Sequence, residues 1–140
     1  MCPWDNALYA LTLQGSVIRE LLEDSIAPFT EAKKSSSRFL QVSGLKIVYN
    51  ITQPVSRRVQ DIKVVCTDCK VPKYVKFDDE KNYRVVVMEY LANGKNGFSL
   101  ISNNAKNMKR GIGDLEALIQ YMQINEPIVA GIEGRIKIVN

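Results

Sequence analysis

The spacing of apolar residues predicts a strand and a helix at the start of the chain. Residues 7–13, "ALYALTL", alternate imperfectly and predict a strand. A helix is expected from Gly15-Ser16 to Pro28, because the apolar residues between them repeat on one helical face and proline cannot continue a helix. The apolar residues of that face are Val17, Ile18, Leu21, Leu22 and Ile26.

The middle of the chain is rich in strand-forming residues. Residues 39–51, "FLQVSGLKIVYNI", predict a hairpin or a bent pair of strands broken at Ser43-Gly44. Two runs rich in β-branched residues, 61–66 and 83–90, predict two further strands. The acidic segment between them, "FDDEKN" at residues 77–82, predicts a surface turn.

The last third of the chain predicts two helices and a closing strand. Residues 98–108 predict a short helix, and Asp114 is a suitable N-cap for a helix over residues 115–123. Residues 134–139, "GRIKIV", predict the last strand. This element order indicates an α+β fold, a mixed β-sheet with flanking helices, and we expect one domain over residues 1–140.

Composition excludes several classes of protein. Hydrophobic residues make up 46% and charged residues 24% of the 140 residues, which is typical of a globular domain. The net charge of +4 comes from scattered lysines and arginines, so we expect no nucleic-acid track. No apolar run is long enough to span a membrane, and the first residues do not form a signal peptide.

The chain contains no histidine. Histidine is the usual general base near neutral pH and the commonest metal ligand. A binuclear metal hydrolase normally needs several histidines, so we expect no such site within these residues.

Cys66 and Cys69 form a C-x-x-C pair, which is found in redox sites, in half of a zinc site and as a tight local disulfide. The segment after the pair contains Pro72 and predicts a loop, whereas a thioredoxin-type site would open a helix. We therefore favour a structural disulfide. Asn50-Ile51-Thr52 is an N-glycosylation sequon, and together with a disulfide it indicates an extracellular protein.

The segment "YLANGKNGFSLI", residues 90–101, contains two Asn-Gly turn signals and then a single large ring, Phe98. One interpretation is that Phe98 packs into the core and starts the next helix. The other is that Phe98 forms one wall of a slot for a flat ligand, where the glycines let the backbone approach closely.

Four motifs, "FLQVSGLKIVYN", "VVCTDCKVP", "YLANGKNGF" and "IEGRIKI", resemble in order the C-terminal domain of the 5'-nucleotidase and apyrase family. The likeness is strongest to animal ecto-enzymes and insect salivary apyrases, and extends from about Cys2 to Ile138. It implies that an N-terminal metallophosphatase domain, with a catalytic histidine and two divalent metals expected to be zinc, lies outside these residues together with the start of the C-terminal domain. The chain itself would hold no catalytic residue, metal ligand or cofactor, and would be inactive alone.

The resemblance also implies how a purine nucleotide or nucleoside is bound, with its base between two aromatic rings. One ring would be Phe98 and the other Trp4 after Pro3, and the family joins the matching cysteines, Cys66 and Cys69, as a disulfide. The substrate-binding residues implied are Trp4, Asn96, Gly97, Phe98 and Asn103.

Two positions depart from the family pattern. Lys95-Asn96 precedes Gly97-Phe98 where Gly-Asp is common, and Asn103 or Asn104 stands where an aspartate holds the ribose hydroxyls. Asparagine can donate and accept hydrogen bonds but carries no charge.

The resulting hypothesis is a substrate-recognition domain of a secreted hydrolase of extracellular nucleotides, glycosylated at Asn50. Its partners would be the nucleotide and the N-terminal domain, with no nucleic acid and no membrane span. No lipid-anchor signal follows the last strand, which favours a soluble secreted form. The alternative is a catalytically inactive secreted binding protein that engages a host protein or receptor.

Overall fold

A computed structural model describes residues 5–30, 36–129 and 131–140 of the chain. The contacts divide it into two compact units. The first unit comprises the described residues of Met1–Gln14 and Asn82–Gly131, and the second unit those of Gly15–Lys81 and Ile132–Asn140. Each unit is therefore assembled from segments that are distant in the sequence.

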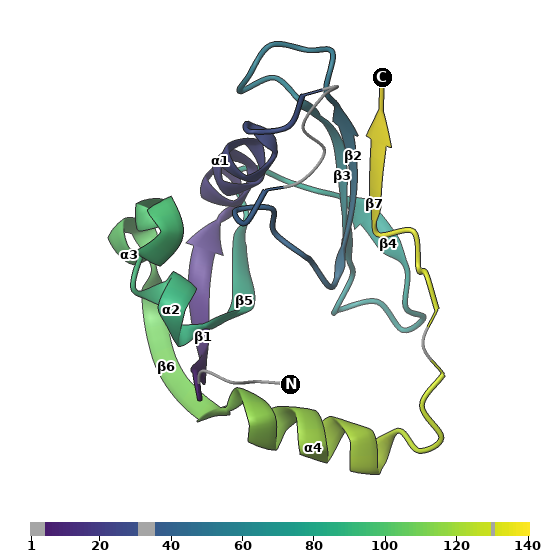
Figure 1. Cartoon of the computed structure of the whole chain (residues 1–140). Coiled ribbons are helices and arrows are strands. Elements are labelled where there is room, and N and C mark those ends of the chain that lie inside the picture. The colour runs from purple at the N-terminus through teal and green to yellow at the C-terminus, as the bar shows by residue number, and fades with distance from the viewer. Residues whose placement is uncertain (1–4, 31–35, 130) are drawn as a thin grey trace. The chain divides into compact units, whose positions relative to one another are not determined.

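The first unit is built on a three-stranded antiparallel sheet with the order β5-β1-β6 (Figure 1). The strands are β1 (Ala7–Gln14), β5 (Asn82–Met88) and β6 (Lys106–Gly113). Leu11 of β1 pairs with Val85 of β5, and the pairing of β1 with β6 contains two register shifts. Leu11 and Leu13 of the central strand are buried, because alternate residues of a strand point to the same face.

Short helices follow the strands of the first unit. They are α2 (Glu89–Ala92), the 3₁₀ turn η1 (Lys95–Gly97), α3 (Ser99–Asn104) and α4 (Asp114–Ile124). Helix α4 directly follows β6, and its apolar residues Leu115, Leu118 and Ile119 are exposed.

The second unit contains helix α1 (Gly15–Ile26) and a four-stranded sheet with the order β4-β3-β2-β7 (Figure 1). The strands are β2 (Leu45–Asn50), β3 (Val59–Val65), β4 (Tyr74–Lys76) and β7 (Ile136–Val139). Strands β2 and β7 are parallel, and the other pairs are antiparallel, so the sheet is mixed.

The core of the second unit combines one face of α1 with one face of the sheet. Ile18, Leu22 and Ile26 of α1 are buried, as are Ile47 and Tyr49 of β2. Burial raises the pKa of the Tyr49 hydroxyl to about 12; the nearby Ser25 hydroxyl opposes this rise and the Glu23 carboxylate adds to it. In the described part of the chain, that hydroxyl makes no hydrogen bond of standard geometry.

Two buried charged residues hold the end of α1 against the segment before β3. The Glu23 carboxylate accepts hydrogen bonds from the backbone nitrogens of Arg58 and Val59, both at 2.9 Å. The Arg58 guanidinium donates to the carbonyl oxygens of Ile26 and Phe29 at 3.1 and 2.7 Å. The Ile26 carbonyl is one of those that a helix end leaves without an intrahelical partner.

The predicted α+β fold is confirmed, with the strands in two sheets. The predictions of β1, α1, β3 and β7 are confirmed within a few residues. Helix α4 also forms, but it begins at Asp114, so the N-cap residue is Gly113 and not Asp114 as predicted. The Asp114 side chain accepts a hydrogen bond from the Leu115 backbone nitrogen.

Three local predictions are wrong. The segment before Ser43 is not a strand: Phe39 packs its ring 4.8 Å from Phe29 and 6.1 Å from Tyr49 instead of pairing its backbone. The helix expected to reach Met108 ends at Asn104, because Lys106–Gly113 pairs with β1 as a strand. The loop expected after the cysteine pair contains the short strand β4.

Candidate functional site

The loop that follows α2 reverses the chain through left-handed backbone conformations. Gly94, Asn96 and Gly97 have φ angles of 73°, 57° and 81°. Glycine adopts this region at no steric cost, and asparagine is among the few other residues that tolerate it. The two Asn-Gly turn signals therefore do form turns, and they bring the chain directly to Phe98.

Phe98 stands at the junction between η1 and α3. Its backbone nitrogen donates to the Lys95 carbonyl at 3.2 Å, and its carbonyl accepts from the Ile101 nitrogen at 3.0 Å. The side chain is 1% exposed, and Ala92 and Ile101 nearby in sequence are buried as well. The ring is thus packed against protein, and neither of its faces is open to solvent in this structure.

Polar groups beside Phe98 in the sequence are exposed. Asn96 and Gly97 lie in the loop, and Asn103 lies on α3. The Asn104 amide donates to the Leu100 carbonyl at 2.9 Å, whereas the Asn103 side chain makes no hydrogen bond to the described residues. Of the two asparagines that the resemblance places at the family's aspartate position, Asn103 is therefore the one with its amide available. Trp4, the other predicted ring, lies outside the described residues.

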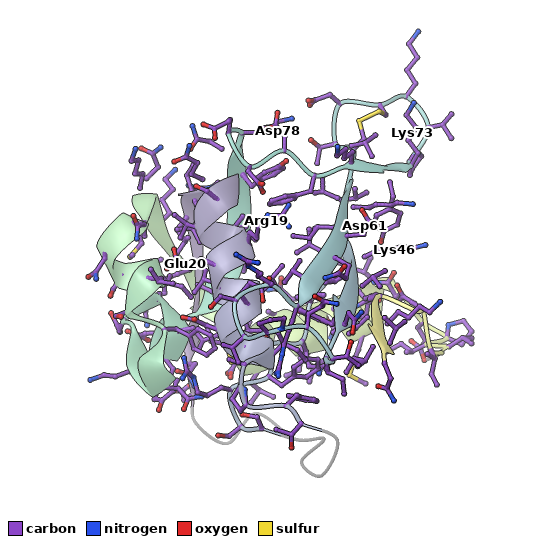
Figure 2. The ribbon with its side chains drawn as sticks, turned by 90° about the horizontal axis from the view of Figure 1, so that it is seen from above. Arg19, Glu20, Lys46, Asp61, Lys73 and Asp78 are labelled. Carbon is purple, nitrogen blue, oxygen red and sulfur yellow. A yellow bond between two sulfur atoms is a disulfide. The ribbon has the colours of Figure 1, made fainter. Side chains whose placement is uncertain are left out.

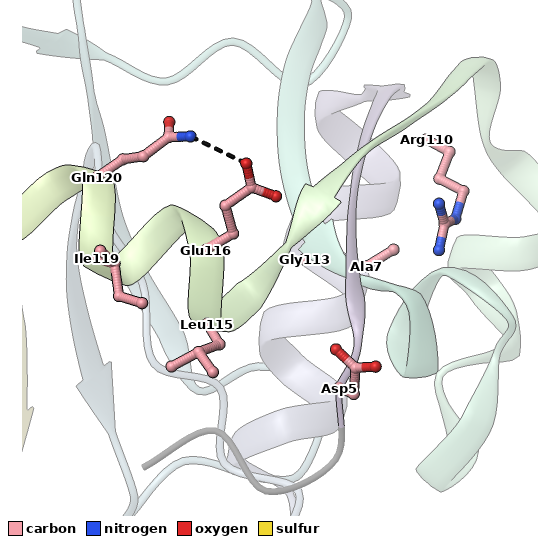
Figure 3. A pocket seen from close by; sticks show the side chains of 8 residues that line it. All are labelled: Asp5, Ala7, Arg110, Gly113, Leu115, Glu116, Ile119 and Gln120. Atoms are coloured by element: carbon pink, nitrogen blue, oxygen red, sulfur yellow. Dashed lines mark hydrogen bonds between the residues drawn. The ribbon is translucent and has the colours of Figure 1, made fainter.

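A shallow depression of about 420 Å³ lies elsewhere in the first unit (Figure 3). Charged and polar side chains from three segments line it: Asp5 before β1, Arg110 on β6, and Glu116 and Gln120 on α4. Gln120 donates to Glu116 at 3.2 Å, and Arg110 does not point toward that pair (Figure 3). Of the substrate-binding residues expected from the sequence, the four that the structure describes, Asn96, Gly97, Phe98 and Asn103, do not line this depression. The segment around Arg110 carries no motif that could have marked it.

Three of the four motifs that carry the family likeness are neighbours in the second unit. The Val65 nitrogen donates to the Gly44 carbonyl at 2.9 Å, which joins the cysteine motif to the "VSG" motif. Arg135 of the "EGR" motif donates from Nη1 to the Val42 carbonyl at 3.2 Å, and its own carbonyl accepts from the Ile47 nitrogen at 2.8 Å. These motifs therefore hold the sheet together.

Cys66 and Cys69 form a disulfide with their Cα atoms 5.5 Å apart (Figure 2). This confirms the structural interpretation of the C-x-x-C pair. The bridge closes the loop between β3 and β4, where the Cys66 nitrogen also donates to the Lys73 carbonyl at 2.8 Å.

Among the described residues, no group of three or more histidine, cysteine, aspartate or glutamate side chains is arranged to bind a metal ion. Within the same residues, no helix has the length and apolarity that a membrane crossing requires.

Comparison with known families agrees with the motifs. The family described as 5'-nucleotidase, C-terminal domain, matches residues 1–103, a range that includes both Trp4 and Phe98. The chain belongs to this family.

Known relatives extend the match to almost the whole chain. An apyrase of Tabanus yao is 38% identical over 139 residues, which cover 99% of this chain and 25% of the apyrase. A snake venom 5'-nucleotidase of Macrovipera lebetinus is 31% identical over 96% of this chain and 32% of its own length. The chain therefore spans between a quarter and a third of these relatives.

A solved structure shows the same fold. The 5'-nucleotidase precursor of Thermus thermophilus matches 99% of this chain and 26% of its own, with a TM-score of 0.83 and 32% identity. Because the relatives are named as nucleotidases and apyrases, a catalytically inactive binding protein is not favoured.

Proposed function

We propose that this chain is the substrate-recognition domain of a secreted enzyme that hydrolyses purine nucleotides. The single observation that carries the proposal is family membership over residues 1–103. Phe98 lies in this range, at the end of the loop in which the resemblance implies that the family stacks the base. A venom protein among the relatives supports secretion. Catalysis would be carried out by a metallophosphatase domain N-terminal to these residues, since the relatives are three to four times as long.

In this proposal the purine base stacks on Phe98 and on Trp4. Phe98 is covered in the present structure, so the base takes the place of the protein groups that now cover one face of the ring. Stacking a base on an aromatic side chain contributes about 1–3 kcal/mol. The left-handed loop supports this role because it fixes the backbone on the N-terminal side of the ring through Gly94 and Gly97.

Asn96, Gly97 and Asn103 supply the polar contacts in the same proposal. The exposed backbone of Gly97 has no side chain to block a ligand, and the Asn103 amide is available to the ribose hydroxyls. An amide lacks the charge that makes a carboxylate the stronger acceptor, so we expect weaker discrimination for the ribose than an aspartate would give.

The test uses the full-length enzyme and compares Phe98→Leu with Phe98→Tyr. Leucine keeps the site apolar but has no ring, whereas tyrosine keeps the ring. We expect Phe98→Leu to raise KM for a purine nucleotide about 5- to 150-fold, the equivalent of losing one stacking contact. Phe98→Tyr should stay within a few-fold of the wild type.

Ribose 5-phosphate, which has no base, is the matched control substrate. Its kcat/KM should be the same in Phe98→Leu as in the wild type, and thermal unfolding shows whether the variant is folded. A folded Phe98→Leu enzyme with the same KM for the nucleotide as the wild type would overturn the stacking role. A parallel loss for both substrates would show that Phe98 acts only through packing.

A further inference from the structure

The sequon Asn50-Ile51-Thr52 lies where β2 ends and a turn begins. The Asn50 side-chain oxygen Oδ1 accepts two hydrogen bonds, from the Thr52 backbone nitrogen at 3.0 Å and from the Thr52 hydroxyl at 2.7 Å. A backbone N–H can only donate, so the atom facing it must be the amide oxygen. The amide nitrogen Nδ2 therefore points elsewhere, and it makes no hydrogen bond to the described residues.

The side chain of Asn50 belongs to the outer face of the four-stranded sheet. Ile47 and Tyr49 of β2 are buried, so Lys46, Val48 and Asn50 alternate onto the opposite face. The strand register places Asp61 of β3 opposite Val48 on that same face. Figure 2 shows Lys46 and Asp61 on the side of the sheet away from α1. A large hydrophilic group attached to Asn50 would therefore lie on a polar surface and would displace no core residue.

The backbone around Asn50 is fixed, although the residue is partly exposed. The Asn50 nitrogen donates to the Arg58 carbonyl at 2.8 Å, and the Ile51 nitrogen donates to the Val139 carbonyl at 3.2 Å. Ile51 itself is 8% exposed and anchors the start of the turn, whereas residues 52–57 are all exposed. A substituent on Nδ2 would thus extend into solvent from a rigid position without breaking a strand pairing.

We propose that Asn50 carries an N-linked glycan. The donor is a lipid-linked diphospho-oligosaccharide. A bond forms between Nδ2 of Asn50 and C1 of the first sugar, the bond between that C1 and the diphosphate breaks, the lipid diphosphate leaves, and the amide loses one proton. No oxidation or reduction takes place. Thr52 supplies the hydroxyl that the Asn-x-Ser/Thr acceptor sequence requires, and Ile51 is compatible with it because only proline is excluded there.

The experiment is a glycopeptide analysis of the full-length protein secreted from insect cells. Asn50 is the only acceptor sequon in these 140 residues, and trypsin releases it within residues 47–57. Enzymatic removal of the glycan in heavy-oxygen water should convert Asn50 to labelled aspartate. We expect most copies of this peptide to carry the label.

Two variants locate the modification. Thr52→Ala should abolish it, whereas Thr52→Ser, which keeps a hydroxyl, should retain it. The wild-type measurement decides the matter if a variant fails to be secreted. An unmodified Asn50 peptide in wild-type protein recovered from the culture medium would overturn the proposal. The result is independent of nucleotide binding, so failure here leaves the proposed function untouched.

Discussion

Gly94 is a position in the candidate loop where a single added methyl group should be costly. Its φ angle of 73° lies in the left-handed region, which costs an L-residue about 1–2 kcal/mol. An added Cβ would also lie 2.5 Å from Oγ of Ser102 and 3.2 Å from Cα of Ser99. Gly94→Ala therefore combines backbone strain with a steric clash against α3.

The clash can be estimated from the groups involved. The Ser102 hydroxyl can rotate away, but it then loses its 3.0 Å hydrogen bond to the Ser99 carbonyl, worth about 0.5–1.5 kcal/mol. The Ser99 contact is to backbone and is relieved only if α3 shifts. Together with the strain, these contributions predict that Gly94→Ala lowers the free energy of unfolding by about 2–3 kcal/mol.

Gly134 provides the matched control. Its φ angle is 62°, and an added Cβ would meet nothing within 4 Å. Gly134→Ala should therefore cost only the left-handed strain, about 1–2 kcal/mol. Urea unfolding followed by circular dichroism would measure both variants.

The double variant Gly94→Ala/Ser102→Ala separates strain from clash. Without the Ser102 hydroxyl, Gly94→Ala should cost about 1 kcal/mol less than in the wild-type background, because the closest contact is gone. Equal costs for Gly94→Ala and Gly134→Ala, with no coupling to Ser102, would refute the close packing of the loop on α3.

Two further predictions concern the core of the second unit. The folded pKa of Tyr49, about 12, exceeds the ordinary 10.0, so the folded state keeps a proton that the unfolded chain loses as the pH rises. The free energy of unfolding therefore falls by about 3 kcal/mol between pH 10 and 12. In Tyr49→Phe this fall should be smaller when unfolding is measured over the same pH range. An equal fall in the variant would contradict the raised pKa of Tyr49. In Glu23→Gln, one of the two backbone N–H groups bound by the carboxylate loses its acceptor, and we expect about 2–3 kcal/mol of destabilisation in urea unfolding. Glu20→Gln, on the exposed side of the same helix, should change stability by less than about 0.5 kcal/mol, and equal effects would show that the Glu23 hydrogen bonds contribute little.

Elements whose apolar residues follow one period could be predicted from the sequence. Helix α1 buries Ile18, Leu21, Leu22 and Ile26, four of the five residues of its predicted apolar face, and Pro28 follows its end. In β1 the buried Leu11 and Leu13 gave the alternation that marked the strand. Here the local pattern and the tertiary burial agree, which is why the prediction is correct.

Elements specified by their partners could not be predicted. Strand β6 has no buried residue and its sequence does not alternate, so only pairing with β1 makes it a strand. Phe39 and its neighbours have strand-like composition, but the ring is used to fill the space beside Phe29 and Tyr49. Composition cannot distinguish an apolar residue that pairs from one that only packs.

The candidate site was predicted in part. The Asn-Gly signals located the left-handed turns at Gly94 and Asn96, because few other residues adopt that conformation. The burial of Phe98 was one of two interpretations that the sequence left open, since exposure depends on groups distant in the chain. The depression beside Arg110 could not be predicted from the sequence, because the residues that line it come from three separate segments.

The path of the chain through the two units has a consequence for how the gene can change by splicing or exon shuffling. The chain passes from one unit to the other after Gln14, after Lys81 and after Gly131. Neither unit is thus encoded by one uninterrupted stretch of gene, and the codons of residues 132–140 contribute the strand that flanks β2 in parallel. A splice variant or frameshift that replaced only those codons would leave all of the first unit's sequence intact, yet it would expose an edge of β2. Exon shuffling could therefore transfer this fold only as a whole.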